Sequence, residues 1–159
     1  MRVMPLLVLL FSFGGSAAMA NCVPPYSTMF ACDLMDDGGR VEFCERIPEG
    51  GGFPDRFSYN FVRAHFRSEL YFEAEDNYGS AKYYRTDDRP IQTVGTGLLH
   101  GEYVYSVFVT GPMNEHPDVA QLHVYKSLKD FQDNKESDIE RLYCDESSII
   151  MNWEHFGPG

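Results

Sequence analysis

Apolar and polar residues alternate in short runs along the chain, and turn residues separate the runs. In residues 28–34, for example, Phe30, Cys32 and Leu34 fall on one side. A period of two residues is typical of half-buried strands. Similar runs cover 40–47, 57–63, 69–74, 81–85, 119–126, 139–144 and 147–153. Residues 102–110 are apolar or aromatic at both alternating positions, which predicts a central strand covered on both faces.

Turn and helix signals separate these runs. Asp36-Asp37-Gly38-Gly39 predicts a turn between the first two strands, and the glycine-containing stretch 94–101 ends in a turn at His100-Gly101. Ser127 followed by Asp130 predicts the start of a short helix within 127–137. The last two runs predict a closing hairpin. The sequence thus predicts an all-β or mainly β fold, a compact antiparallel sandwich or barrel of about eight strands with one short helix.

The first 20 residues have the pattern of an export signal. Arg2 precedes an apolar stretch over 3–13, and Ala18-Met19-Ala20 fits a cleavage site before Asn21. The apolar stretch is too short to cross a hydrocarbon layer of about 30 Å as a helix. A lipid anchor on the nearby Cys22 is disfavoured, because Asn21 is not the small residue expected there. We therefore expect residues 21–159 to form a single periplasmic or secreted domain without a transmembrane segment.

Four cysteines, Cys22, Cys32, Cys44 and Cys144, follow the predicted cleavage site. An even number in an exported chain predicts two disulfides out of three possible connectivities, and the wide spacing does not suit a zinc site. Matching the apolar faces of the first two strands places Cys32 opposite Phe43 and Leu34 opposite Val41, which disfavours a Cys32–Cys44 bridge. Of the remaining pairings, we expect Cys22–Cys44 with Cys32–Cys144.

The charge of the chain excludes several classes of partner. Asp and Glu number 24 against 13 Lys and Arg, a formal charge of −11 that becomes −12 when Arg2 leaves with the signal. Nucleic acids and anionic membrane surfaces need the opposite sign. The content of 10 Tyr, 12 Phe and 1 Trp is too aromatic for a disordered acidic segment.

Motifs of catalysis and metal binding are missing from the sequence. The five histidines have no chelating spacing, and no G-x-S-x-G motif is present. The acidic runs Asp36/Asp37, Glu73/Glu75/Asp76 and Asp87/Asp88 are typical of solvated turns, and the second of them lacks the spacing of a calcium loop. We expect no catalytic residue, metal or cofactor.

Tyrosine is the most informative residue type for function. Exposed tyrosines give rigid contact area with a polar tip and are enriched at binding surfaces, although tyrosine also favours strands. The candidate binding residues are Tyr71, Tyr83, Tyr103 and Tyr105. The leading hypothesis is an exported, non-enzymatic β-domain that acts by binding a protein or a ligand.

The strand pair 29–44 also resembles part of a family of small exported proteobacterial β-proteins. The resemblance rests on an F-x-C…R-V-E-x-C hairpin (Phe30 to Cys44), a G-x-Y-x-Y-x-V strand (Gly101 to Val107) and a late L-x-C-D-x-x-S element (Leu142 to Ser148). It implies a β-rich fold and a periplasmic location and no particular reaction. The early Cys22 and the segment 127–137 depart from the family pattern.

More remotely, the layout is similar to periplasmic inhibitors of lysozyme, which are disulfide-stapled β-domains that bind a basic enzyme. An acidic chain suits such a target, because complementary fields speed encounter. The first alternative is therefore an inhibitor of a basic hydrolase, and the expected partner is a basic protein or an envelope component. A small periplasmic hydrolase or metal-dependent enzyme is the second alternative.

Overall fold

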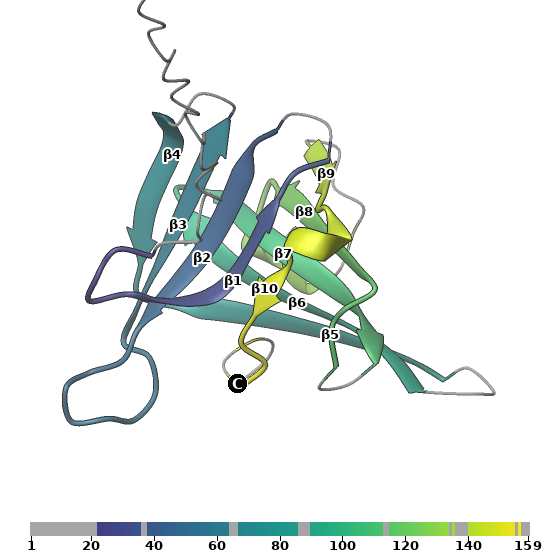
Figure 1. Cartoon of the computed structure of the whole chain (residues 1–159), viewed down its shortest axis with the longest axis horizontal. Coiled ribbons are helices and arrows are strands. Elements are labelled where there is room, and N and C mark those ends of the chain that lie inside the picture. The colour runs from purple at the N-terminus through teal and green to yellow at the C-terminus, as the bar shows by residue number, and fades with distance from the viewer. Residues whose placement is uncertain are drawn as a thin grey trace, which may run out of the picture.

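Two five-stranded antiparallel sheets face each other, and the strands of one cross those of the other (Figure 1). The structure is a computed structural model that describes residues 22–35, 38–63, 67–85, 90–112, 115–133, 135, 140–154 and 156. The predicted export signal, residues 1–20, lies outside the described residues. The predicted fold class, an antiparallel all-β domain with one short helix, is confirmed.

The spatial order of the strands shows that each sheet is largely a meander. The first sheet contains β10 (Ile150–Met151), β1 (Ser27–Asp33), β2 (Arg40–Arg46), β3 (Arg56–Arg63) and β4 (Arg67–Ala74). The second contains β5 (Asn77–Arg85), β6 (Pro90–His100), β7 (Tyr103–Pro112), β8 (Val119–Tyr125) and β9 (Glu140–Tyr143). The chain passes from the first sheet to the second between β4 and β5, and it returns after β9 to add β10 beside β1.

The predicted closing hairpin is wrong, because β9 pairs with β8 whereas β10 pairs with β1 in the other sheet. The segment between the two strands crosses from sheet to sheet. The Cys144 N–H donates to the Ala120 carbonyl over 3.0 Å, and the Asp145 N–H donates to the Asp33 carbonyl over 2.8 Å. The N–H groups of Cys144 and Asp145 are therefore not available for a hairpin between β9 and β10. A short 3-10 turn, η1 (Glu146–Ser148), follows them.

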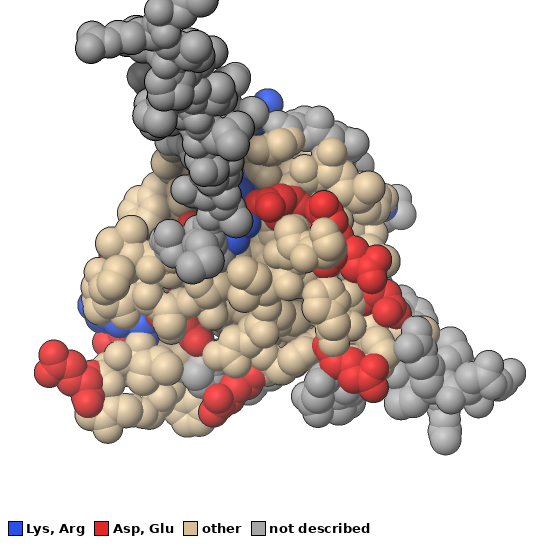
Figure 2. Space-filling view, in the orientation of Figure 1, with Lys and Arg blue, Asp and Glu red and all other residues tan. Residues whose placement is uncertain are grey.

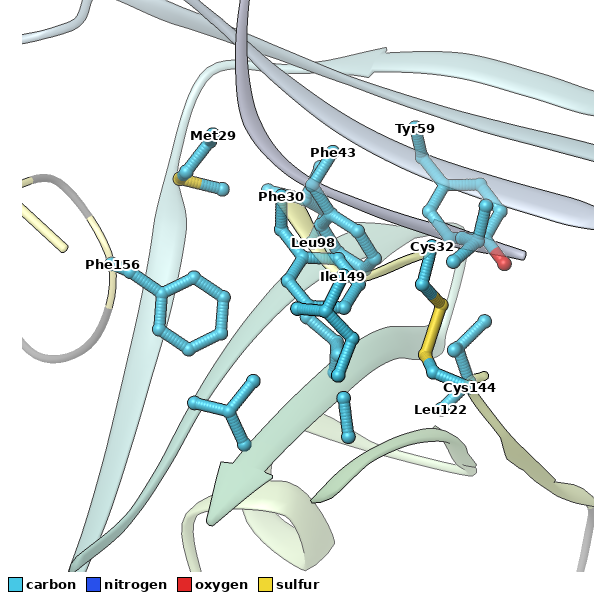
Figure 3. Close-up of a cluster of buried hydrophobic side chains, with 14 of the residues drawn as sticks. Met29, Phe30, Cys32, Phe43, Tyr59, Leu98, Leu122, Cys144, Ile149 and Phe156 are labelled. Carbon is cyan, nitrogen blue, oxygen red and sulfur yellow. A yellow bond between two sulfur atoms is a disulfide. The ribbon is translucent and has the colours of Figure 1, made fainter. Parts of the chain in front are cut away.

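The inner faces of both sheets form the main core. Phe30, Phe43 and Leu98 are fully buried there, and the Phe30 and Phe43 rings meet edge to face with centroids 6.3 Å apart. Figure 3 shows this cluster, with Tyr59 at one side of it and the Cys32–Cys144 disulfide nearby. The same alternating residues that predict the strands thus hold the two sheets together.

A second, smaller core lies on the outer face of the second sheet, under the helix α1 (Leu128–Gln132). Ser127 caps this helix by accepting a hydrogen bond from the Asp130 N–H, as the sequence predicts. Phe131 is fully buried against Val104 and Phe108. The β7 strand is therefore covered on both faces, which confirms that prediction. None of the described helices has the length and apolarity needed to span a bilayer.

The sequence pattern does not predict the strand β6, because the glycines of residues 94–101 favour a turn. A Cβ on Gly95 would lie 2.4 Å from the Phe108 ring, and one on Gly97 would lie 2.7 Å from Val104 Cγ1. Side chains of the second core thus fill the space where these residues would carry their own. The predicted turn at Gly101 is confirmed, with φ at +64°.

The β1–β2 register differs from the prediction by two residues. Cys32 lies opposite Val41 and Phe30 opposite Phe43, because pairing continues to Leu34, whose N–H donates to the Gly39 carbonyl over 2.8 Å. A shift of two keeps every side chain on its expected face.

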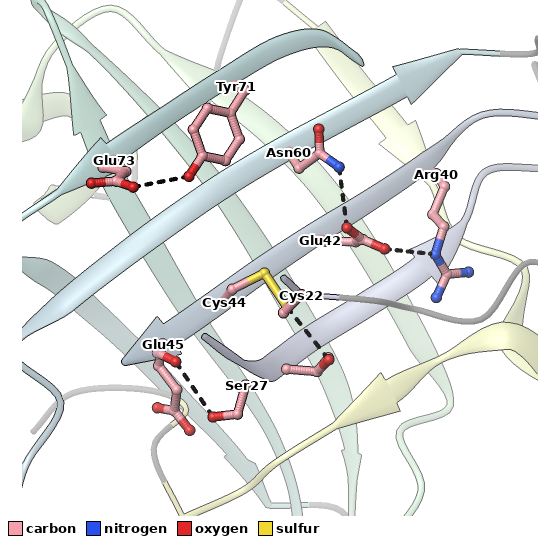
Figure 4. Close-up of a disulfide and its surroundings, with 10 residues drawn as sticks. Cys22, Ser27, Arg40, Glu42, Cys44, Glu45, Asn60, Tyr71 and Glu73 are labelled. Atoms are coloured by element: carbon pink, nitrogen blue, oxygen red, sulfur yellow. Dashed lines mark hydrogen bonds and ion pairs between the residues drawn. A yellow bond between two sulfur atoms is a disulfide. The ribbon is translucent and has the colours of Figure 1, made fainter. Parts of the chain in front are cut away.

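Both predicted disulfides are confirmed by this arrangement. Cys22–Cys44 lies on the outer face of the first sheet (Figure 4), and Cys32–Cys144 joins β1 to the segment after β9. The second bridge therefore connects the two sheets.

Candidate functional site

The candidate tyrosines do not share one surface. Tyr71 is 55% exposed on the outer face of β4, where its hydroxyl donates to Glu73 Oε1 over 3.0 Å (Figure 4). Burial and the neighbouring Glu73 carboxylate raise the pKa of Tyr71. Tyr83 belongs to β5, and its side chain lies outside the described part of the structure.

Tyr103 and Tyr105 share a face of β7, and that face points toward the first sheet. Tyr103, at the strand end, is 40% exposed, whereas Tyr105 is half-buried with its ring centroid 5.3 Å from that of Tyr59. Tyr105 therefore faces the space between the two sheets. The helix side of β7 is occupied by Val104 and Phe108, so the alternate residues turn inward.

Tyr105 lines a cavity of about 260 Å³ between the two sheets, near the edge strands β4 and β9. Apolar and aromatic side chains make most of its wall. The lining residues are Tyr59, Phe61, Glu69, Leu70, Tyr105, Ser106, Leu122, His123, Val124, Glu140 and Leu142. A concave, mostly apolar site with a few polar groups is typical of small-molecule binding.

Tyr59 and Tyr105 are among the polar residues that line this cavity. Tyr59 is only 4% exposed, and burial followed by the charges of Tyr105 and Glu140 raises its pKa. Burial also raises the pKa of Tyr105. Neither hydroxyl has a hydrogen-bond partner among the described residues. Both tyrosines thus stay neutral at physiological pH and can donate or accept one further hydrogen bond.

Three charged residues lie at the mouth of the cavity. Arg63, at the end of β3, places its Nε 3.4 Å from Glu69 Oε2 and its Nη2 3.7 Å from Glu140 Oε1. The guanidinium carbon also lies 5.7 Å from the centroid of the Phe61 ring. Because Glu140 belongs to β9, these ion pairs connect the two sheets across the opening.

The histidines that could take part in catalysis lie on different elements. His100 stacks on Phe72 at the end of β6, with centroids 4.4 Å apart. The ring of His123 packs between Phe108 and Tyr125 on the helix side of the second sheet, and its Nε2 lies 3.1 Å from Gln121 Oε1. Within the described residues, no three His, Cys, Asp or Glu side chains gather as a metal site would require. The pairs Asp36/Asp37 and Asp87/Asp88 lie outside those residues.

A second hollow, of about 330 Å³, lies beside the loop 115–118 and the C-terminal segment. Trp153 forms part of its wall and donates from Nε1 to the Glu115 carbonyl over 2.9 Å. It presents one aromatic ring against a loop, whereas the inter-sheet cavity combines several rings with unpartnered hydroxyls. We therefore take the inter-sheet cavity as the candidate site.

Sequence reasoning missed most residues of the cavity. In the sequence, Tyr59 is only one of the alternating aromatic positions of its strand, between Phe57 and Phe61. A hydroxyl in an otherwise apolar face was the available signal, because buried polar groups need partners. The pairing of Arg63 with Glu140 joins residues far apart in the chain, so no local pattern indicates it.

Comparison with known proteins gives no match to a protein-family model, a curated protein or a solved structure. The resemblance to small exported proteobacterial β-proteins therefore stays a prediction. The candidate function depends on the cavity itself.

Proposed function

We propose that this chain is an exported, periplasmic or secreted protein that acts by binding and has no catalytic activity. Its ligand is a compact, mostly apolar molecule held between the two sheets. The observation that supports this proposal is the position of Tyr59, a residue only 4% exposed that lines a cavity with mostly apolar walls and whose hydroxyl has no hydrogen-bond partner among the described residues. A ligand that forms a hydrogen bond with this hydroxyl gains a net contribution of about 0.5–1.5 kcal/mol.

The size of the cavity limits the ligand. An apolar cavity of about 150 Å³ in another protein holds one benzene molecule. The volume of about 260 Å³ therefore admits a six-membered ring with a short substituent, or an aliphatic chain of similar size. Larger ligands such as complete lipids do not fit without movement of the sheets.

The proposal can be tested by filling the cavity. The methyl groups of Leu70, Leu122 and Leu142 line it, so a small aromatic alcohol such as 2-phenylethanol should shift their NMR signals. Leu142→Phe should weaken this binding at least tenfold, because the larger ring occupies the ligand's space.

Leu128→Phe is the matched control, since Leu128 packs in the second core on the opposite face of the sheet. It should leave binding unchanged. Thermal unfolding of both variants shows whether a loss of binding comes from a blocked cavity or from a damaged fold. Leu70→Phe is a second variant with a filled cavity. Equal binding by the wild type and folded cavity-filled variants would contradict the proposal.

A basic protein partner is a second candidate, favoured by the charge of −11. Figure 2 shows several patches of Asp and Glu side chains on one face of the molecule and fewer Lys and Arg side chains. Such a surface attracts a basic hydrolase such as lysozyme, or a basic envelope component.

A further inference from the structure

A cationic side chain of the protein itself, the guanidinium group of Arg63, lies at the mouth of the inter-sheet cavity. The Arg63 guanidinium lies within 3.7 Å of carboxylate oxygens of Glu69 and Glu140, and near the face of the Phe61 ring. Both carboxylates and the ring line the cavity. Two carboxylates and an aromatic face are the groups that bind ammonium and guanidinium ions.

Among Arg63, Glu69 and Glu140, the described charged side chains joined by these ion pairs, negative charge exceeds positive charge. Glu69 and Glu140 carry two negative charges, and Arg63 carries one positive charge. All three side chains are nearly half exposed, and the contacts of Arg63 with Glu69 and Glu140 measure 3.4 and 3.7 Å. Exposed pairs of this kind contribute about 1 kcal/mol or less, so a ligand cation can compete with Arg63 at little cost.

Groups inside the cavity also favour a cationic ligand. The Tyr59 and Tyr105 rings lie 5.3 Å apart, and the negative charge of Glu140 reaches the Tyr59 hydroxyl, where it contributes to the raised pKa. The two unpartnered hydroxyl oxygens can accept N–H bonds. Tyr59, a largely buried residue whose hydroxyl has no partner among the described residues, is evidence for a ligand that is independent of the acidic pair at the mouth.

We propose that the ligand is a compact organic amine in its protonated form, with its ammonium group between Glu69, Glu140 and the aromatic rings and its apolar part among the leucines. This inference rests on the proposed ligand-binding function of the cavity. An anionic ligand is disfavoured, because it would face both carboxylates while Arg63 is already paired with them.

Three probes of similar shape test the sign of the ligand's charge: 2-phenylethylamine, 2-phenylethanol and 3-phenylpropionate. Titrations of the purified protein, followed through the cavity methyl signals, should give at least about tenfold tighter binding of the amine than of the alcohol. The carboxylate should bind weakest. This order should become less pronounced as salt is added, because screening weakens exposed charge interactions.

Substitutions at the mouth test which residues set the preference. Glu140→Gln should weaken amine binding about fivefold and leave the alcohol unchanged, whereas Arg63→Gln should strengthen amine binding by removing the internal competitor. Glu146→Gln and Arg56→Gln are matched controls with the same charge changes. Glu146 lies in η1, and Arg56 pairs with Glu75 at the other end of β3. Neither control should alter the order of the three probes.

The outcomes separate this inference from the proposed function. If the alcohol binds in the cavity and the amine binds no tighter, the preference for a cation is wrong and the cavity remains a ligand site. Amine binding that Glu140→Gln and Glu146→Gln reduce equally would also overturn the inference, since net charge alone would then explain it. If none of the three probes shifts a cavity methyl group, both proposals fail.

Discussion

His123 combines burial with a ring nitrogen, Nδ1, that has no hydrogen-bond partner. Burial, and then the positive charge of Arg141, lower the pKa of His123 from 6.5 to about 4. The unfolded chain thus takes up a proton between about pH 6.5 and 4 that the folded protein does not. The corresponding contribution to stability is present above pH 6.5 and is lost as the pH falls toward 4.

We therefore expect the wild type to lose about 2–3 kcal/mol more unfolding free energy than His123→Gln between pH 7.5 and 4.5. Urea unfolding at the two pH values measures this difference. His116→Gln, at an exposed position, should follow the wild type. Parallel pH profiles of the wild type and His123→Gln would show that the folded protein protonates this ring as readily as the unfolded chain does.

Single residues differ in how far the sequence reveals their position. The alternating pattern placed Phe30 and Phe43 in the core, because a strand fixes the direction of each side chain from its neighbours. For Tyr105 the pattern gave the strand but left open which face meets the other sheet. The packing of α1 over the Val104 side of β7 decides that face, and it depends on contacts between distant segments.

The glycines of strand β6 make room for the second core on the outer face of the sheet. Gly95 and Gly97 leave room on the outer face of the sheet for Phe108, Val104 and Phe131. Local propensity alone indicates a loop there, because glycine is depleted in strands and weakens them. The elements that the sequence predicted well, such as β7 and the capped start of α1, carry local signals that agree with their packing.

We expect Gly95→Ala and Gly97→Ala each to destabilise the protein by about 1–3 kcal/mol, because the added methyl group would overlap buried side chains of the second core. Chemical denaturation measures the loss. Gly50→Ala is the control, since a Cβ there meets nothing within 4 Å, and it should change stability by less than about 0.5 kcal/mol. Equal stability of all three variants would mean that the Phe108 and Val104 side chains move aside without cost.

On the scale of the whole molecule, charge favours a basic partner. If the chain inhibits lysozyme, we expect the affinity to fall at least tenfold between about 50 and 500 mM NaCl, because the Debye length falls from above 10 Å toward 3 Å. Inhibition assays at several salt concentrations measure this dependence. Cytochrome c, a basic protein with no hydrolase activity, separates specific inhibition from attraction by charge. Inhibition that is insensitive to salt would contradict the electrostatic basis of this candidate.

The arrangement of the sheets was only partly predictable. Two layers of antiparallel strands follow from the alternating runs, but the separation of β9 and β10 into different sheets does not. Their sequences have equal strand character, and the choice of partner depends on the crossing at Cys144 and Asp145. The cavity is a product of this arrangement, so it could not be predicted before the sheets were placed.

The two disulfides overlap along the chain, since Cys32 lies inside the Cys22–Cys44 loop and Cys144 lies outside it. A single peptide-bond cleavage anywhere between residues 22 and 144 therefore leaves both fragments joined by at least one bridge. A cut in an exposed loop, such as the one around Gly51, would release no fragment. The protein can thus be nicked once by a protease and still remain one covalent molecule, as long as its surroundings stay oxidising.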